Sequence, residues 1–213
     1  WCEPPRMDDR LRDALVWSDP EAAQSTGTVA GFVITPFADT ALTGLAALND
    51  GRGDESALNT LLIAESASSA VLLTELAKQT AARVRPAVYY HARGWERFPE
   101  RERNVSFFSG HSSLAFSIAV SAGTISSMRG YRLAPLVWSV GVPLAAFTAY
   151  SRIAADAHWA SDVLVGSAVG VAAGFTIPYV FHPPVTTGSA VVTWRPVVSP
   201  VPGGAVAGVA GSL

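Results

Sequence analysis

The chain has 213 residues, of which 49% are hydrophobic and 15% are charged, and its formal net charge is −2. A chain of this length and composition can form one domain with a large core, and it lacks the general basic surface that nucleic-acid binding requires. Because charged residues fall well below the usual quarter of a globular domain, the composition indicates a membrane environment or a very apolar core. Cys2 is the single cysteine, so the chain has no internal disulfide.

The N-terminal segment, residues 1–27, is polar and predicts a short amphipathic helix. Leu11 and Leu15 follow Asp8 and Asp9 at helical spacing, which gives this helix one apolar face. We expect that face to pack on the core of the protein, with a position on a membrane surface as the alternative.

Residues 28–181 contain long apolar runs separated by short polar turns. The runs cover residues 28–48, 57–77, 114–127, 133–149 and 159–180. Apolar helices joined by short turns form a bundle, so we predict an all-α fold with about five long helices. Each run approaches the roughly 20 residues that a helix needs to cross a bilayer. Small residues in the last run, among them Gly166, Gly170 and Gly174, permit a neighbouring helix to approach closely.

Two regions lie outside the apolar runs. Residues 87–105 form a long loop in which aromatic residues are interleaved with arginines, which suits either an amphipathic substrate with an anionic head or a solvated lid without specific contacts. Residues 182–213 are rich in Pro, Gly and Val and cannot continue the bundle as helix. We expect an extended, irregular tail there, with short strands around residues 191–198.

The second apolar run ends in a lysine and an arginine that share a helix face. Lys78 and Arg85 are seven residues apart, about two helical turns, and Pro86 ends the helix. Glu75 lies three residues before Lys78, and we expect it to hold the lysine ammonium in place. Glu65, further into the same run, is expected to be a hydrogen-bonded carboxylate in the core.

A small polar turn precedes the third apolar run. Ser109, Gly110 and His111 come just before residues 114–127, so they are expected to open a helix. Free backbone N–H groups and the positive end of the helix dipole would then face whatever lies above His111. Such a helix start, together with basic side chains, is what a bound phosphate needs.

A second histidine lies where the fourth run ends and the fifth begins, between Arg152 and Asp162. If the helix begins directly after His158, then His158 and Asp162 lie at positions i and i+4 on one face. We expect the carboxylate to accept the Nδ1 proton of the imidazole, which leaves Nε2 unprotonated and able to act as a nucleophile. The other two histidines, His91 and His182, match no motif and are interpreted as structural.

The three patterns together resemble the signature motifs of the type 2 phosphatidic acid phosphatase superfamily, which also includes bacterial acid phosphatases and vanadate haloperoxidases. They read K-x6-R-P, S-G-H and S-R-x5-H-x3-D, and they occur in the family's order between Lys78 and Asp162. Three spaced motifs are far more specific than one. This chain has Phe108 where the family usually has a proline before S-G-H, a difference that changes the rigidity of that loop.

The resemblance implies a phosphatase that hydrolyses a phosphomonoester or a diphosphate, most plausibly of a lipid. His158, oriented by Asp162, would attack phosphorus and form a phosphohistidine, and His111 would protonate the leaving oxygen and then activate water. The phosphate oxygens would be held by Lys78, Arg85, Ser109, Gly110 and Arg152. Because the cations among these neutralise the developing charge, the resemblance implies no metal and no other cofactor.

The expected partners are a phosphorylated lipid or small molecule and a membrane, and the oligomeric state stays open. The resemblance places the protein in a bacterial membrane with its site on the periplasmic or extracellular side, and a soluble periplasmic protein is the alternative. Two other functions stay open: a vanadate-dependent haloperoxidase that uses the same residues, and a non-catalytic membrane protein of this fold. The haloperoxidases are longer chains, and the intact set of motif residues argues against a non-catalytic protein.

Overall fold

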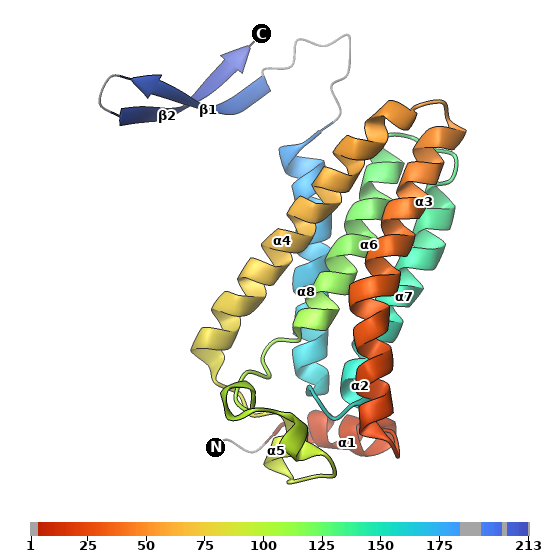
Figure 1. Cartoon of the computed structure of the whole chain (residues 1–213), viewed down its shortest axis with the longest axis vertical. Coiled ribbons are helices and arrows are strands. Elements are labelled where there is room, and N and C mark those ends of the chain that lie inside the picture. The colour runs from red at the N-terminus through yellow and green to blue at the C-terminus, as the bar shows by residue number, and fades with distance from the viewer. Residues whose placement is uncertain (1–3, 184–192, 202–203, 213) are drawn as a thin grey trace. The chain divides into compact units, whose positions relative to one another are not determined.

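The computed structural model describes residues 4–183, 193–201 and 204–212. The chain divides into two compact units, one ending at His182 and the other beginning at Pro183. The first unit is a bundle of helices, with no strand among its described residues (Figure 1). This confirms the predicted all-α fold.

Two helices occupy the N-terminal region where one was predicted, α1 (Arg6–Leu15) and α2 (Pro20–Val29). Asp19 caps α2, because its side chain accepts hydrogen bonds from two backbone N–H groups of the first turn, each at 3.1 Å. Pro20 follows as the first helical residue, where its fixed φ suits the helix and its missing N–H costs nothing. The first bundle helix therefore begins ahead of the predicted start at residue 28.

The helix α2 continues through a π-helical turn (Ala30–Ile34) into α3 (Thr35–Asn49). Pro36 lies at the start of α3, where its ring would clash with the preceding turn of a regular α-helix. The wider π-helical turn before it accommodates the ring. Together these segments form one continuous rod.

The helix α4 (Ser56–Ala81) begins beside α3 and runs back toward the other end of the bundle, leaning away from the rod (Figure 1). Its C-cap residue, Ala82, adopts a left-handed φ of 45°. The predicted loop at residues 87–105 follows. Short helical turns organise it: α5 (Pro86–Tyr89) and the 3-10 turns Trp95–Arg97 and Glu100–Glu102.

The helix α6 (Gly110–Met128) lies at the centre of the bundle (Figure 1). It packs against α3, α4, α7 (Ala134–Ala154) and α8 (Ala160–Thr176), and a π-helical turn (Ile177–Phe181) extends α8. Most side chains of α6 are buried on all sides, whereas its neighbours expose apolar faces. The rod, α4, α6, α7 and α8 are the long helices that the apolar runs predicted.

A stripe of glycines on α8 allows close packing on α6. A Cβ atom at Gly166, Gly170 or Gly174 would lie between 2.3 and 2.6 Å from a backbone carbonyl oxygen of the segment that leads into and forms α6. Backbone atoms in a helix cannot move aside singly, so a larger residue would push the two helices apart. The predicted role of these glycines is confirmed, and Gly166 fixes Ser109, directly before α6, against α8.

The outward surface of the bundle is largely apolar. Four helical segments are long and apolar enough to cross a membrane: Pro20–Asn49, Gly53–Tyr89, Ala134–Ala154 and Ala160–Phe181. Phe37 and Leu61 are among the exposed apolar side chains on these segments. Glu65 was predicted to lie in the core, but its carboxylate is at the surface, 3.0 Å from Nε2 of His182. A surface partner at the end of the bundle thus replaces the expected core hydrogen bond.

The second unit contains an antiparallel hairpin of β1 (Thr193–Val201) and β2 (Gly204–Ser212). Thr193 pairs with Ser212 at one end, and Val201 pairs with Gly204 at the other. The strand predicted around residues 191–198 overlaps β1, although residues 191 and 192 lie outside the described residues. The second strand was not predicted, because its Gly- and Ala-rich sequence has little strand propensity of its own.

Candidate active site

The ends of α4 and α7 and the beginnings of α6 and α8 meet at one end of the bundle (Figure 1). A cavity of about 500 Å³ lies there. Six of the eight residues predicted to form the site line it: Lys78, Arg85, Gly110, His111, Arg152 and His158. The other two, Ser109 and Asp162, are fully buried and do not line the cavity.

Arg152 lies in the last turn of α7 and is 2% exposed. Its Nη2 donates a hydrogen bond to Oε1 of Gln24 on α2 at 3.2 Å, while Nε and Nη1 have no partner within the described structure. Gly27 permits this packing, because a Cβ atom there would lie 1.9 Å from Oγ of Ser151. A cation buried without a carboxylate is unfavourable, so an anion in the cavity would stabilise this arrangement.

Arg85 lies between α4 and α5 and is 7% exposed. Its Nε donates to the carbonyl oxygen of Glu102 at 2.8 Å. Its Nη1 donates to the carbonyl oxygen of Ala157 at 2.8 Å and lies 3.0 Å from Nε2 of His158. Neutral acceptors therefore hold this guanidinium, and its positive charge remains available to an anion.

Lys78 lies in the last turn of α4, beside the start of α6. Its Nζ is 2.8 Å from Oε1 of Glu75, which confirms the predicted pairing. A Cβ atom at Gly110 would lie 3.5 Å from the same Nζ, so the ammonium is adjacent to the N-terminus of α6. The lysine charge and the helix dipole thus act on the same space.

His158 precedes α8 and is 3% exposed. Its Nδ1 lies 2.7 Å from the carbonyl oxygen of Ser106, and its Nε2 faces a guanidinium N–H of Arg85. Since a carbonyl only accepts and a guanidinium only donates, the proton resides on Nδ1 and the lone pair on Nε2. Burial and the nearby Arg85 and Arg152 cations hold the pKa of His158 well below its usual value, so the imidazole is neutral.

The predicted hydrogen bond between Asp162 and His158 is wrong. Oδ2 of Asp162 lies 3.9 Å from Nδ1 of the imidazole, and it accepts hydrogen bonds from the Trp159 N–H at 3.0 Å and the Ser106 hydroxyl at 2.5 Å. The reason is local: α8 begins at Ala160, so His158 lies outside the helix and shares no face with Asp162. The carboxylate caps α8 and reaches the imidazole through Ser106.

Ser109 also differs from the prediction that its hydroxyl faces a phosphate. It is the N-cap of α6, and its Oγ accepts a hydrogen bond from the Ser112 hydroxyl at 2.8 Å. Its backbone N–H donates to the carbonyl oxygen of Asp162 at 3.1 Å. Ser109 therefore builds the helix start, while Gly110 and His111 line the cavity.

His111 lies in the first turn of α6 and lines the cavity. The ring of Phe32 packs edge-on against its imidazole, with 4.7 Å between the ring centroids. Its Nε2 has no hydrogen-bond partner among the residues that the structure describes. The imidazole is thus held by packing, and one ring nitrogen is left for a ligand.

Sequence reasoning missed three residues that support this site: Gln24, Ser106 and Arg83. Gln24 contacts Arg152, Ser106 holds the imidazole of His158, and Arg83 pairs with Asp162. Gln24 and Ser106 gave no signal, because a neutral polar residue acquires its role only through contacts made on folding. Arg83 gave a weak one, since it is a third cation within the K-x6-R-P motif.

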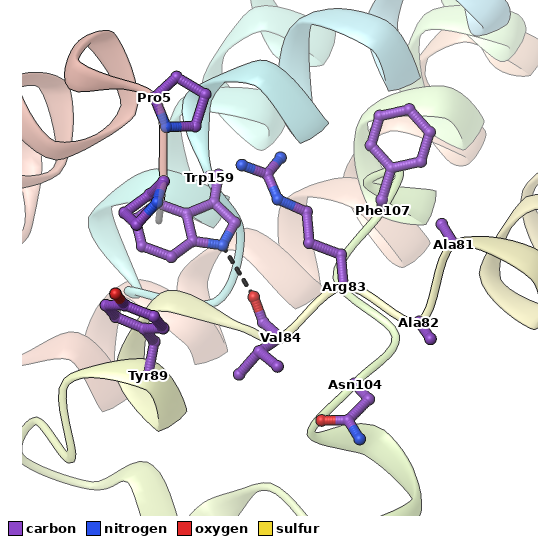
Figure 2. A pocket seen from close by; sticks show the side chains of 10 residues that line it. Pro5, Ala81, Ala82, Arg83, Val84, Tyr89, Asn104, Phe107 and Trp159 are labelled. Atoms are coloured by element: carbon purple, nitrogen blue, oxygen red, sulfur yellow. Dashed lines mark hydrogen bonds between the residues drawn. The ribbon is translucent and has the colours of Figure 1, made fainter. Parts of the chain in front are cut away.

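A second cavity, of about 680 Å³, adjoins the loops of the site (Figure 2). Arg83 lines this cavity, whereas Arg85 lines the first one. The backbone of residues 83–85 is hydrogen-bonded to the backbone of residues 103–106. The Arg85 N–H donates to the Arg103 carbonyl, and the Ser106 N–H donates to the Arg83 carbonyl. Much of the lining is apolar or aromatic: Pro4, Pro5, Val84, Tyr89, Phe107 and Trp159.

Cations dominate the walls of the first cavity around the two histidines. Nowhere in the described part of the chain do three or more His, Cys, Asp or Glu side chains gather around a point that could hold a metal ion. The cavity is lined by a neutral imidazole with a free lone pair, a second imidazole and four basic side chains, of which Arg101 is exposed. They suit the binding and transfer of an anionic group such as phosphate.

Two solved structures are similar to this chain. The structure of a transmembrane PAP2 type phosphatidylglycerolphosphate phosphatase from Bacillus subtilis has a TM-score of 0.56 and 19% identity, over 80% of this chain and 82% of that chain. Aquifex aeolicus LpxE gives a TM-score of 0.45 and 20% identity, over 72% of this chain and 93% of that chain. The similarity to the Bacillus subtilis structure is a similarity of fold.

A lipid A 1-phosphatase of Porphyromonas gingivalis is 41% identical over 69 residues, which is 32% of this chain. The match spans only 15% of the length of that relative. The family model of the PAP2 superfamily matches residues 59–184, a range that contains all three motifs and more than half of the chain. The chain belongs to the PAP2 superfamily.

Proposed function

We propose that this protein is a metal-independent phosphatase that hydrolyses a phosphomonoester or diphosphate of a lipid through a phosphohistidine intermediate. One observation carries the proposal: two buried guanidinium groups, Arg85 and Arg152, line one cavity and have no carboxylate partner among the described residues. Buried charges are normally paired, and phosphate is an anion whose geometry suits arginine.

Three basic side chains would bind the phosphate. Lys78 supplies a point charge beside the start of α6, and the Gly110 N–H lies at the same helix terminus. Arg85 and Arg152 supply planar N–H donors from two other directions. Because these groups stabilise the negative charge that develops on the phosphate oxygens, they supply the stabilisation that a metal ion gives in other phosphoryl transferases.

His158 would be the nucleophile. Its Nε2 lone pair already lies 3.0 Å from Nη1 of Arg85, so a phosphate bound to that guanidinium is adjacent to the attacking atom. Attack forms the N–P bond and breaks the P–O bond to the leaving group. The carbonyl of Ser106 would stabilise the imidazole throughout by accepting a hydrogen bond from its Nδ1–H group.

His111 would serve as the general acid and then the general base. Burial and the nearby Arg152, Arg85 and Lys78 cations lower the pKa of His111 to about 2, and the negative charge of a bound phosphate would raise that pKa again. Once protonated beside the phosphate, the imidazole would donate a proton to the departing oxygen, which would otherwise leave as an alkoxide. It then takes a proton from a water molecule that attacks phosphorus. The N–P bond breaks, its electron pair returns to Nε2 of His158, and inorganic phosphate is released.

A lipid substrate and a membrane location follow from the outer surface of the bundle. Four helical segments are long and apolar enough to cross a membrane, and the cavity lies at the end of the bundle where a headgroup would meet water. The relatives named above act on lipid phosphates by their descriptions, lipid A and phosphatidylglycerolphosphate. We place the site on the periplasmic or extracellular face of a bacterial membrane by analogy with the family.

Phosphate release and intermediate trapping test the proposal. The detergent-solubilised protein is incubated with a phosphatidate, a phosphatidylglycerol phosphate and a polyprenyl diphosphate, each with and without a chelator. We expect phosphate release unaffected by the chelator, and an acid-labile, base-stable phosphoenzyme after rapid quenching. The variant His158→Gln should form no phosphoenzyme.

Two outcomes would contradict the proposal. Loss of activity in the chelator, restored by a divalent cation, would show that a metal ion is required. Halide oxidation by peroxide after loading with vanadate, without phosphate release from any of the three substrates, would indicate a haloperoxidase instead.

A further inference from the structure

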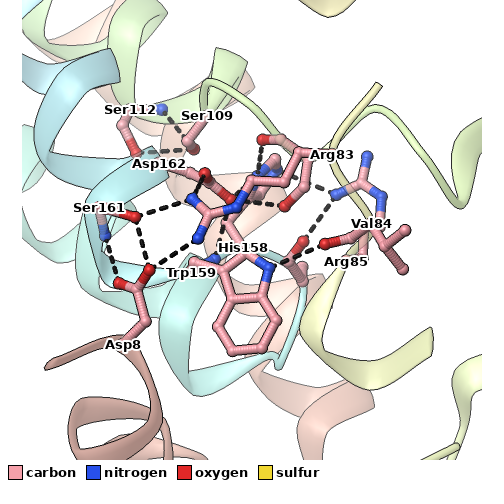
Figure 3. Close-up of polar contacts among 12 residues, drawn as sticks. Asp8, Arg83, Val84, Arg85, Ser109, Ser112, His158, Trp159, Ser161 and Asp162 are labelled. Carbon is pink, nitrogen blue, oxygen red and sulfur yellow. Dashed lines mark hydrogen bonds and ion pairs between the residues drawn. The ribbon is translucent and has the colours of Figure 1, made fainter. Parts of the chain in front are cut away.

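A buried carboxylate on the N-terminal helix α1 reaches the start of α8, next to the site. Asp8 is fully buried although α1 lies at the surface of the bundle. Its Oδ1 accepts a hydrogen bond from the Ser161 N–H at 2.8 Å, and its Oδ2 accepts one from the Ser161 hydroxyl at 2.7 Å (Figure 3). Asp8 therefore binds one of the free N–H groups in the first turn of α8, that of Ser161, from a different helix.

Arg83 joins Asp8 to the third motif. Its Nη2 donates to Oδ2 of Asp8 at 2.7 Å, and its Nη1 donates to Oγ of Ser161 at 2.8 Å and to Oδ1 of Asp162 (Figure 3). One guanidinium thus lies between two fully buried carboxylates. Without it the two negative charges would be buried without a cation, which is strongly unfavourable.

The chain of contacts continues to the imidazole. Oδ2 of Asp162 accepts the Ser106 hydroxyl at 2.5 Å, and the Ser106 carbonyl holds Nδ1 of His158 at 2.7 Å. The backbone N–H of Ser106 in turn donates to the Arg83 carbonyl at 2.9 Å. Arg83 therefore fixes Ser106 in two ways, through its own backbone and through Asp162.

We propose that Asp8 and Arg83 are positioning residues of this site, and that α1 completes the support of His158. The proposal rests on the function proposed above, in which His158 is the nucleophile. Asp162 alone cannot orient the imidazole, because its Oδ2 lies 3.9 Å from Nδ1 and forms no hydrogen bond with it. Orientation comes from Ser106, whose place depends on a guanidinium that α1 holds by a buried carboxylate.

The proposal predicts a loss of turnover rather than of substrate binding. The three phosphate-binding cations Lys78, Arg85 and Arg152 do not touch Asp8 or Arg83, so KM should stay within about twofold. A misplaced Nε2 slows attack, and removing a group that orients a reactive histidine costs on the order of 10-fold or more. We expect kcat to fall by about 10-fold in Asp8→Asn and in Arg83→Gln.

A matched control separates this role from the simple docking of α1. Asp9 is the next residue on the same helix, and its Oδ1 accepts a hydrogen bond from the Tyr90 hydroxyl at 2.7 Å. Asp9→Asn removes the same charge from the same turn without touching the contacts to Asp162. It should leave kcat unchanged, and the double variant Asp8→Asn/Arg83→Gln should lose no more than the larger of the single losses.

Chemical rescue tests the placement of Arg83 directly. Its side chain is 25% exposed and lines the cavity of about 680 Å³, so a small cation can enter the space left by truncation. Low millimolar guanidinium or methylguanidinium should restore a substantial part of kcat in Arg83→Ala, with no effect on His158→Gln. A protein that had merely lost its fold would not recover in this way.

The outcomes distinguish this inference from the proposed function. If the wild-type protein releases no phosphate from any substrate, the proposed function fails first. If the wild-type protein is active and Asp8→Asn retains the same kcat as Asp9→Asn, the inference is overturned while the function stands. Circular dichroism and size-exclusion profiles accompany each variant, and if Arg83→Ala does not fold, the comparison of Asp8→Asn with Asp9→Asn decides alone.

Discussion

The two ends of the helical bundle both carry clustered charges, but they satisfy them differently. At the end away from the cavity, Glu55 lies 2.7 Å from Nη2 of Arg52 and 3.0 Å from Nη1 of Arg129, and it also accepts the Tyr131 hydroxyl. Every one of these contacts joins a donor to a carboxylate within the protein. This end is electrostatically complete without a ligand.

At the cavity end, by contrast, two buried arginines lack such partners. Arg85 and Arg152 are more buried than Arg52 or Arg129, yet neither has a carboxylate partner among the described residues. Carboxylates are present nearby, but Asp8 and Asp162 are both bound to Arg83. We infer that the ion pairs at the end away from the cavity stabilise the fold, whereas the unpaired arginines at the cavity end are available to bind an anion.

The largest effects are expected when one arginine at each end of the bundle is replaced by glutamine. Arg152→Gln should lower kcat/KM by on the order of 10²–10³-fold, because it removes donors to the phosphate in the transition state. Its thermal stability should be unchanged or higher, since an unpaired buried charge is removed. Arg129→Gln should keep its activity and lose about 1–2 kcal/mol of unfolding free energy, because Glu55 loses a charged partner.

Phosphate-release kinetics and thermal unfolding in detergent measure both effects. Inorganic phosphate should raise the Tm of the wild-type protein and of Arg129→Gln, but not that of Arg152→Gln. The comparison fails if Arg152→Gln unfolds at a lower temperature while its kcat/KM stays near that of the wild-type protein.

The second test concerns the imidazole that has no hydrogen-bond partner for Nε2. His111→Ala should slow the hydrolysis of an alkyl phosphate by on the order of 10²-fold, because the leaving alkoxide then departs without a proton. A nitrophenyl phosphate should lose much less, since its leaving group is stable as an anion. His91→Ala serves as the control, because His91 is exposed and lies outside the cavity. Equal losses for the two substrates would argue against general acid catalysis by His111.

The sequence predicted the bundle and the place of the site, because both follow from local patterns. Apolar runs set the helices, and motif residues at alternate helix ends must meet at one end of an antiparallel bundle. The orientation of His158 was beyond this reasoning. It depends on the residue at which α8 begins. The helix was expected to begin directly after His158 and begins instead at Ala160, and with this shift of one residue the partner of the imidazole is Ser106 and not Asp162.

Contacts between distant segments were also hidden from the sequence. Asp8 and Asp162 are far apart in the chain, and only the folded bundle places one guanidinium between them. The charge of Asp8 was visible as part of an amphipathic pattern, which predicts an exposed face. Its complete burial follows from the docking of α1 at the start of α8, which no helical periodicity encodes.

The third test uses pH, and its sign follows from the neutral state of His158. The pKa of this buried imidazole lies well below the value of about 6.5 expected in the unfolded chain, so in mild acid only the unfolded state binds the proton. This contribution to stability is fully present above about pH 6.5 and is lost as the pH falls toward the folded pKa. The unfolding free energy should therefore fall as the pH is lowered from about 7 to about 5.

Unfolding curves of the wild-type protein and of His158→Gln at several pH values measure the contribution of His158 to the pH dependence of stability. The variant has no imidazole at this position, so its stability should fall less steeply in acid than that of the wild-type protein. Parallel curves for the two proteins would mean that folding does not lower the pKa of His158, in which case burial does not hold the imidazole neutral.

The smallest effect is expected for the exposed ion pair between Arg132 and Asp50, at the end of the bundle away from the cavity. Arg132 is 77% exposed, its Nε lies 2.8 Å from Oδ1 of Asp50, and hydrogen bonds from its backbone and side chain lower the pKa of that carboxylate. Exposed ion pairs contribute little because water and salt screen them, so Arg132→Gln should shift Tm by less than about 2 °C and leave kcat unchanged. The depressed pKa gives the sign: the contribution is present above the unfolded pKa of about 3.9 and is lost as the pH falls below it. A drop in kcat without a change in Tm would mean that this end also serves the reaction, and the contrast between the two ends would no longer hold.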